Sequence, residues 1–142
     1  PRLKPGTAQG LFAGMTTPAA PSSGMRMQAP GLLGVNAAHT LCSTAFTGSH
    51  ACTNAEIYRN GYAGLIPTGT SGLLYETGAF NDPGAAATSN SLKATCSHLT
   101  TTAGNGSQFQ VLSITVGGVP GPQVKLSAGV PCSTALQLAC CY

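Results

Sequence analysis

Six cysteines constrain the fold of this chain more than any other feature of its sequence. All of them lie beyond residue 41, and the last two are adjacent: Cys42, Cys52, Cys96, Cys132, Cys140 and Cys141. An even set of this size within 142 residues is typical of an extracellular domain whose loops are closed by disulfides. No C-x-x-C pair occurs, so we expect neither a dithiol redox motif nor a zinc site of four cysteines.

Three histidines close to cysteines make zinc binding the rival hypothesis. The pairs are His39 with Cys42, His50 with Cys52, and His98 with Cys96. A cysteine that coordinates zinc as a thiolate cannot also be oxidised, so the two hypotheses exclude each other. We favour disulfides, because a secreted chain meets an oxidising environment, and we therefore predict no metal ligands and no cofactor.

Charged residues make up only 6% of the chain, against about 25% in a typical soluble domain. Six scattered cations cannot form the basic stripe that phosphate binding needs, so nucleic acid is excluded as a partner. No run approaches the roughly 18 apolar residues of a membrane span. The chain opens at Pro1 without a leader, and we expect a mature secreted protein, extracellular or on the cell surface.

A surface with so little charge needs another source of solubility. One source is glycosylation, and Asn105-Gly106-Ser107 is an acceptor-type triplet for it. The other is burial of much of the surface against identical subunits, which a net charge near zero favours. The two can coexist.

Residues 1–34 differ from the rest of the chain. They contain five prolines, many glycines and no cysteine, which breaks both helical and strand periodicity. The segment is too apolar for a solvated linker, because it contains Leu3, Leu11, Phe12, Met15, Met25, Met27, Leu32 and Leu33. We interpret it as an extended arm that packs on its own domain or on a neighbour, and residues 35–142 as the domain itself. A flexible tail is the alternative.

Two short helices are predicted after the arm. In the first, Asn36 caps a run at 37–46 with small and apolar residues every four positions. The second opens with Thr53 and Glu56 as a capping box, and Gly61 ends it. The capping box gives Glu56 a structural role, so Glu56 is not counted as a catalytic candidate.

The sequence becomes β-like beyond residue 62, with long loops expected at 80–107. The predicted strands are 73–75, 108–116, 124–126 and 135–141. Turns are expected at Gly117-Gly118 and again at Pro120-Gly121-Pro122. Helices first and strands later indicate an α+β domain with a small, mostly antiparallel sheet.

Several short motifs resemble those of a known family. Ala38-His39-Thr40-Leu41-Cys42 is followed by Gly48-Ser49-His50-Ala51-Cys52-Thr53 and Glu56, and later by Leu138-Ala139-Cys140-Cys141. Over about residues 35–142 this pattern resembles secreted bacterial domains of the C-type-lectin-like superfamily, in the endostatin-like branch. The resemblance implies a compact α+β fold in which the first helix is stapled to the last strand.

The resemblance also implies how the cysteines pair. It has Cys96 bridging Cys132, with Cys42 and Cys52 each bonding one member of the adjacent pair at 140–141. Adjacent cysteines rarely bond each other, which favours the same division. Each bridge closes a long loop and is expected to stabilise the fold by about 3–5 kcal/mol. The chain departs from the family in having no tryptophan, since Ser97-His98-Leu99 stands where such domains usually carry one.

If the chain is instead a binding module, its ligand surface is expected on the loop-rich half, at about 62–107. Asn81-Asp82-Pro83 is a distant echo of the calcium-dependent sugar site of true C-type lectins, but one carboxylate cannot hold a cation that wants six or more oxygens. Tyr62 and Tyr75 offer aromatic faces for stacking against sugars, with half-buried packing as their alternative role. The candidate ligand surface is therefore Tyr62, Tyr75, Asn81 and Asp82.

Catalysis has few candidate residues. A carboxylate pair for acid–base chemistry would have to come from Glu76 and Asp82, and Gly69-Thr70-Ser71-Gly72 is a turn sequence and not a G-x-S-x-G elbow. We predict no catalytic residues and no enzyme activity. The leading hypothesis is an extracellular structural subunit that polymerises through residues 1–34 into a filament or layer. The alternative is a lectin-like adhesin module that binds glycans or proteins.

Overall fold

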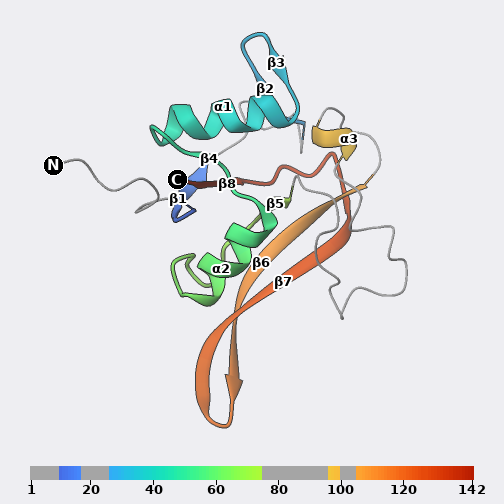
Figure 1. Cartoon of the computed structure of the whole chain (residues 1–142). Helices are drawn as coiled ribbons and strands as arrows, with labels where there is room; N and C mark the ends of the chain where they lie inside the picture. Colours follow the sequence, from blue (N-terminus) through green and yellow to red (C-terminus); the bar gives the residue numbers. More distant parts are fainter. Residues whose placement is uncertain (1–9, 17–25, 75–95, 100–104) are drawn as a thin grey trace, which may run out of the picture.

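The computed structural model describes residues 10–16, 26–74, 96–99 and 105–142 (Figure 1). The helices in this part are α1 (Val35–Ala45), α2 (Asn54–Tyr62) and the short α3 (Cys96–Leu99). The strands are β1 (Phe12–Thr16), β2 (Gln28–Ala29), β3 (Leu32–Leu33), β4 (His50–Ala51), β5 (Ser71–Leu74), β6 (Asn105–Val116), β7 (Val119–Pro131) and β8 (Leu138–Cys141). The chain is a small α+β domain whose described strand pairs are all antiparallel.

Helix α1 begins one residue before the position predicted for its cap. Its N-cap is Gly34, and Asn36, which was expected to cap it, lies exposed inside the first turn. The β2–β3 hairpin explains the difference. The Gly34 amide donates to Met27 O at 2.9 Å, and Gly34 O accepts from the Ala38 amide at 3.0 Å, so the hairpin leads the chain directly into the helix.

Helix α2 confirms the predicted capping box. The Thr53 hydroxyl accepts from the Glu56 amide at 3.2 Å, and the Glu56 carboxylate accepts from the Thr53 amide at 2.9 Å. The prediction that Gly61 ends the helix is wrong, because the helix runs on to Tyr62. Gly61 instead lets α2 approach β7: a Cβ placed there would lie 2.2 Å from Cγ2 of Val124.

Strands β6 and β7 form a long hairpin whose turn end extends past α2 (Figure 1). The predicted turn at Gly117-Gly118 is confirmed, with positive φ angles of 58° and 80° at the two glycines. The second predicted turn, at 120–122, is wrong, since these residues continue β7 opposite Thr115, Ile114 and Ser113. A proline is compatible with a strand where its missing amide would face away from the neighbouring strand.

The C-terminal strand β8 lies in a different sheet from the hairpin. Strands β1, β8 and β4 form one sheet in that order, and β5, β6 and β7 form another. The prediction that residues 135–141 complete the hairpin's sheet is therefore wrong. The arm supplies β1, which pairs with β8 from Phe12 opposite Cys141 to Thr16 opposite Leu138.

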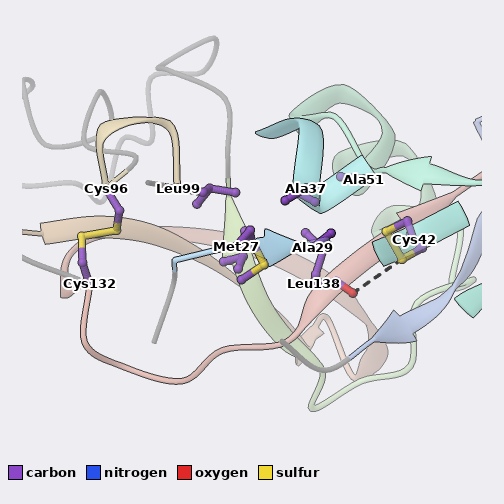
Figure 2. Packing of buried hydrophobic residues seen from close by; sticks show 12 residues of the cluster. Met27, Ala29, Ala37, Cys42, Ala51, Cys96, Leu99, Cys132 and Leu138 are labelled. Atoms are coloured by element: carbon purple, nitrogen blue, oxygen red, sulfur yellow. Dashed lines mark hydrogen bonds between the residues drawn. A yellow bond between two sulfur atoms is a disulfide. The ribbon is translucent and has the colours of Figure 1, made fainter. Parts of the chain in front are cut away.

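Two clusters of buried side chains make up the core. The first packs α1 against the β2–β3 hairpin and β8, and includes Met27, Ala37, Cys42, Leu99 and Leu138 (Figure 2). The second packs α2 against β5, β6 and β7, and includes Ile57, Ile66, Leu74, Phe109 and Val111. Met27 and Ala29 are buried, so this part of the arm packs on its own domain, while Leu32 and Leu33 stay exposed.

Three disulfides tie these layers together. Cys42 is bonded to Cys140, Cys52 to Cys141, and Cys96 to Cys132, closing separations of 98, 89 and 36 residues. Each member of the adjacent pair thus has its own partner, and α1 is joined directly to β8. None of the helices in the described part of the chain has the length and apolar character needed to cross a membrane.

Candidate functional site

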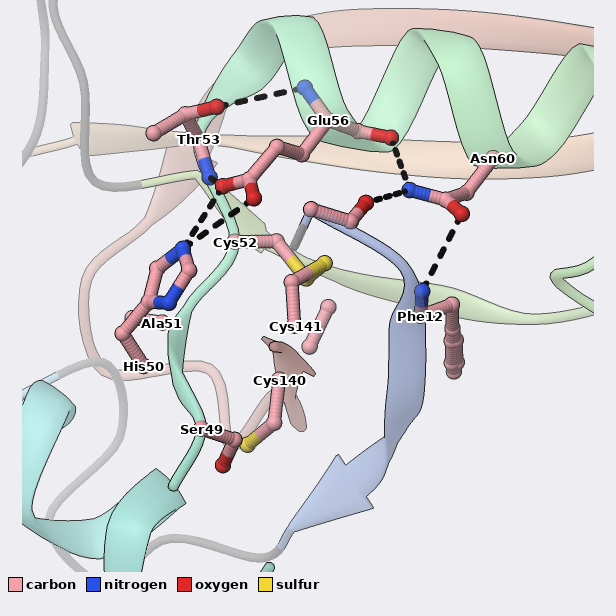
Figure 3. The surroundings of a disulfide bond; sticks show 12 residues. Phe12, Ser49, His50, Ala51, Cys52, Thr53, Glu56, Asn60, Cys140 and Cys141 are labelled. Atoms are coloured by element: carbon pink, nitrogen blue, oxygen red, sulfur yellow. Dashed lines mark hydrogen bonds and ion pairs between the residues drawn. A yellow bond between two sulfur atoms is a disulfide. The ribbon is translucent and has the colours of Figure 1, made fainter. Parts of the chain in front are cut away.

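The densest group of polar interactions surrounds the Cys52–Cys141 disulfide (Figure 3). Strand β8 lies there between β1 and β4, and the start of α2 stands beside them. Because adjacent residues of a strand point to opposite faces, Cys140 and Cys141 reach different partners on the two sides of the sheet. The disulfides therefore fix β8 to α1 on one face and to the segment that leads into α2 on the other.

The capping-box carboxylate of Glu56 has a second partner. The His50 ring Nε2 lies 2.9 Å from one oxygen of Glu56 and 3.1 Å from the other. His39 stands nearby, with its ring centroid 6.3 Å from that of His50, and its Nδ1 accepts from the Ala51 amide at 3.1 Å. The two histidines and the carboxylate thus position α1, β4 and α2 against one another.

The surroundings shift the pKa of two of these groups. Burial raises the pKa of Glu56, but the hydrogen bonds from the Thr53 amide and from His50 outweigh it, so the net pKa lies below its ordinary value. Burial lowers the pKa of His39, and the neighbouring His50 lowers it further, while Glu56 opposes both. The fold therefore favours an ionised Glu56 and a neutral His39.

Asn60 holds the arm in place from the next turn of α2. Its amide nitrogen donates to Gly10 O and to Glu56 O, both at 2.7 Å, and its Oδ1 accepts from the Phe12 amide at 3.0 Å. Arg59 also donates to Gly10 O, at 3.0 Å. Asn60 is only 1% exposed, and its amide satisfies backbone groups of Gly10 and of Phe12, the first residue of β1.

The arm strand also contacts the last residue of the chain. The Tyr142 amide donates to Leu11 O at 2.9 Å, and the Gly10 amide donates to Tyr142 O. Strand β1 is thus held by the ladder to β8 on one side and by the Asn60 side chain on α2. We call this set of contacts, made by residues 10–16 with β8, Tyr142, Arg59 and Asn60, the arm seam.

An aromatic pair lies on the exposed side of α2. The rings of Tyr58 and Tyr62 are stacked, with centroids 5.9 Å apart and 23° between their planes. Tyr62 is 52% exposed, so one ring is available to a ligand. Of the other predicted ligand residues, Tyr75, Asn81 and Asp82 lie outside the described residues.

The cysteines provide no thiolate for metal binding or nucleophilic attack, because all six are in disulfides. This excludes the zinc site that the histidine–cysteine spacings raised. Residues 10–16, 26–74, 96–99 and 105–142 contain no group of three His, Cys, Asp or Glu side chains that could hold a metal ion. Ser49, next to His50, donates its hydroxyl to Cys42 O at 2.8 Å.

Sequence reasoning located part of this site and missed part. It identified the Thr53–Glu56 capping box, but it did not predict the hydrogen bond between His50 and Glu56 or the role of Asn60. Asn60 follows Glu56 by one helical turn and lies on the helix face that carries Ile57 and Gly61. A polar residue on this apolar face was the signal that could have identified it. The proposed glycosylation acceptor, Asn105, begins β6 opposite Pro131.

No family model, curated protein or solved structure matches this chain. Indications of its function therefore come from the geometry of its own residues.

Proposed function

We propose that this chain is a secreted, non-enzymatic structural subunit of the C-type-lectin-like type that polymerises through its N-terminal arm into an extracellular filament or layer. The arm seam carries this proposal. Strand β1 is an edge strand of its sheet, and the surface of β8 that it covers is the same in every copy of the chain. Exchange of such a strand between identical copies joins subunits head to tail, and a contact of that kind leads to open polymers.

The lengths of the segments favour exchange of β1 alone. Residues 26–34 are anchored by Met27 in the first core cluster, whereas β1 is joined to them through 17–25, which includes Pro18 and Pro21. A connection of nine residues spans at most about 30 Å, so an exchanged β1 reaches a subunit in direct contact. The hydrogen bonds of Asn60 to Gly10 and Phe12 then form between two copies as well as they form within one.

Three further features support an extracellular role. The three disulfides suit an oxidising environment. The low charge of the chain suits burial against neighbours. The bond between α1 and β8 agrees with the arrangement that the C-type-lectin-like resemblance implies.

Cross-linking between labelled chains tests the exchange directly. A photoreactive benzophenone amino acid replaces Phe12, and isotopically light and heavy chains are refolded together before illumination. The proposal predicts cross-linked peptides that join a light β1 to a heavy β8, together with polymers visible in negative stain. The same amino acid at Tyr62 is the control, because α2 lies outside the exchanged segment. Cross-links confined to chains of the same label, in a monomeric sample, would contradict the proposal.

The second candidate function is a lectin-like adhesin module, which the exposed ring of the Tyr58–Tyr62 stack favours. Aromatic faces bind the apolar face of sugars. A glycan array with the wild-type chain and with Tyr62→Ala tests it. Binding lost in the variant supports this function, and an array without signal for either chain removes it. A chelator arm in the same array tests whether calcium contributes.

A further inference from the structure

The two outer edges of the β6–β7 hairpin differ in their hydrogen-bonding capacity. The Val111 amide donates to Thr70 O at 2.9 Å, and Val111 O accepts from the Gly69 amide at 2.7 Å, so the backbone polar groups of Val111 point away from β7. In an antiparallel pair this direction alternates along the strand. Ser113 and Thr115 have the same parity as Val111, and their amides and carbonyls therefore also point outward from β6.

The opposite edge is blocked by proline. Ser113 pairs with Pro122 and Thr115 with Pro120, so the nitrogens of both prolines lie on the outward side of β7. A proline there removes the donor that an added strand would need, a common protection of sheet edges. The chain protects the β7 edge in this way, while the β6 edge at 112–116 has neither a proline nor a charged residue.

The β6 edge also borders an apolar surface. Leu112, Ile114 and Val116 share one face of the strand, with Val119 opposite Val116 on β7. Val116 is 71% and Val119 69% exposed, and no described segment of the chain pairs with this edge beyond Val111. In Figure 1 this half of the hairpin extends past α2 with no described element beside it. We call residues 112–116 the open edge.

We propose that the open edge binds the open edge of a second copy, so that two β6 strands join antiparallel across a two-fold axis at Ile114. The ends of the open edge determine this register. Val111 is already bonded to residues 69–70, and Gly117 begins the turn, so only Ser113 and Thr115 have free outward groups. Centring the pairing on Ile114 places Ser113 of each copy opposite Thr115 of the other. The outward amides and carbonyls of these residues then form hydrogen bonds between the two copies.

The composition of the hairpin explains why a second copy is the partner. Residues 107–124 contain no Asp, Glu, Lys, Arg or His, so two such hairpins meet without repulsion between charges. The same register brings Ile114 against Ile114 and Leu112 beside Val116, which joins the two apolar faces into one. The contact is isologous and closes as a pair, unlike the head-to-tail exchange of β1. It uses residues that the arm seam does not touch, so either contact can form without the other.

A charge pair at the two-fold axis tests the partner and the register together. Sedimentation of the monomeric fraction, isolated before β1 exchanges, over about 10 µM to 1 mM, a range suited to weak interfaces, is expected to show a reversible monomer–dimer equilibrium. Head-to-tail polymers formed by exchange of β1 sediment separately as larger species. Ile114→Lys places like charges opposite each other and raises the dissociation constant at least about 100-fold, and Ile114→Asp does the same. Mixing the two variants restores the dimer, because each axis then carries one charge of each sign.

A proline variant is the second probe. Thr115→Pro removes an outward amide and leaves the β6–β7 ladder intact, so it abolishes the dimer while the circular dichroism spectrum stays unchanged. Thr115→Ala, which keeps the amide, is the matched control and dimerises like the wild type. A dimer that survives Ile114→Lys or Thr115→Pro would overturn the proposal. So would self-association that disappears only when β1 is displaced, since it would belong to the arm seam.

Hydrogen exchange on the wild-type chain shows whether a second copy or another segment of the same chain covers the open edge. The amides of Ser113 and Thr115 are expected to gain protection as the concentration rises, while those of Leu112 and Ile114, which bond β7, are protected at every concentration. Protection of Ser113 and Thr115 that persists at high dilution would mean that another segment of the same chain covers the edge, and would refute the two-copy contact. A wild-type chain that stays monomeric with both amides unprotected would refute it as well.

Discussion

The junction around β8 and the distal half of the β6–β7 hairpin are both antiparallel sheets, yet they are stabilised in different ways. Every residue of β8 is buried, and two of its four residues are cross-linked to other elements. From Leu112 to Pro120 every residue of the hairpin is exposed, and only the ladder between its strands holds it. Covalent bonds and packing fix the shape in the first region, whereas the second presents backbone and apolar side chains to a partner.

The largest expected effect comes from removing both bridges that hold β8. The variant Cys42→Ala/Cys52→Ala/Cys140→Ala/Cys141→Ala frees sequence separations of 98 and 89 residues, and chain entropy alone predicts a loss of at least about 4–5 kcal/mol of unfolding free energy. Urea denaturation followed by circular dichroism measures it. Thr44→Ala, on the exposed side of α1, is the control and should change little. A loss below about 1 kcal/mol would mean that packing, not the bridges, holds β8.

Two substitutions on the same strand sharpen the contrast between core and hairpin. Phe109 is fully buried, and Phe109→Ala is expected to cost about 3–5 kcal/mol because it leaves a cavity under α2. Ile114 is 37% exposed, and Ile114→Ala should cost less than about 1 kcal/mol in a dilute, monomeric sample. Equal losses for the two variants would show that the distal hairpin is packed in solution.

A pair of glycines makes the same comparison for added volume. Gly61→Ala forces a methyl group against Val124 and is expected to cost about 1–3 kcal/mol. A Cβ added at Gly121, on the distal hairpin, would meet nothing within 4 Å, so Gly121→Ala should be neutral or slightly stabilising. Thermal unfolding of both variants measures the difference, and a neutral Gly61→Ala would place α2 farther from β7 than the structure has it.

The smallest expected effect is a dependence of stability on pH that arises from His39 and Glu56. The pKa of His39 is lowered from 6.5, so the unfolded chain takes up a proton first as the pH falls below that value, and stability decreases. The pKa of Glu56 is also lowered, and the stability it contributes is lost as the pH falls through its folded value. Both groups therefore make the fold less stable in acid.

Variants separate the two contributions. His39→Asn keeps an acceptor for the Ala51 amide and removes the step that begins near pH 6.5, while Glu56→Gln removes the step at lower pH. Urea midpoints measured between about pH 3 and 8 are the readout. An unchanged pH profile in both variants would assign the acid sensitivity to other groups.

Local signals predicted local structure in this chain. The Thr53–Glu56 capping box and the Gly117-Gly118 turn were predictable because each depends on residues at most three apart. Gly61 and Pro120–Pro122 were misjudged for one reason: their usual meaning in a sequence is a break. Gly61 lies inside α2 because its missing side chain makes room for Val124. Pro120 and Pro122 lie inside β7 because their nitrogens are on the outer edge of the strand, where no hydrogen bond to β6 is lost.

The arrangement of the candidate site required information that spacing does not carry. The sequence placed residues 135–141 in one sheet with the hairpin, because nothing local indicates that β8 lies between β1 and β4. Asn60 contacts Gly10 and Phe12, 50 and 48 positions earlier, and His50 meets Glu56 only because β4 lies beside the first turn of α2. Such contacts follow from the packing of several elements, which a single sequence does not specify.

The position of β8 has a consequence for the order in which the protein matures. Its two cysteines find their partners 98 and 89 positions earlier, and its ladder joins the arm to β4. Synthesis must therefore pass residue 141 before both bridges can form, and until then β1 and β4 have no strand between them. Oxidation of these thiols is thus a late event, and a slow one for a topology rich in distant contacts.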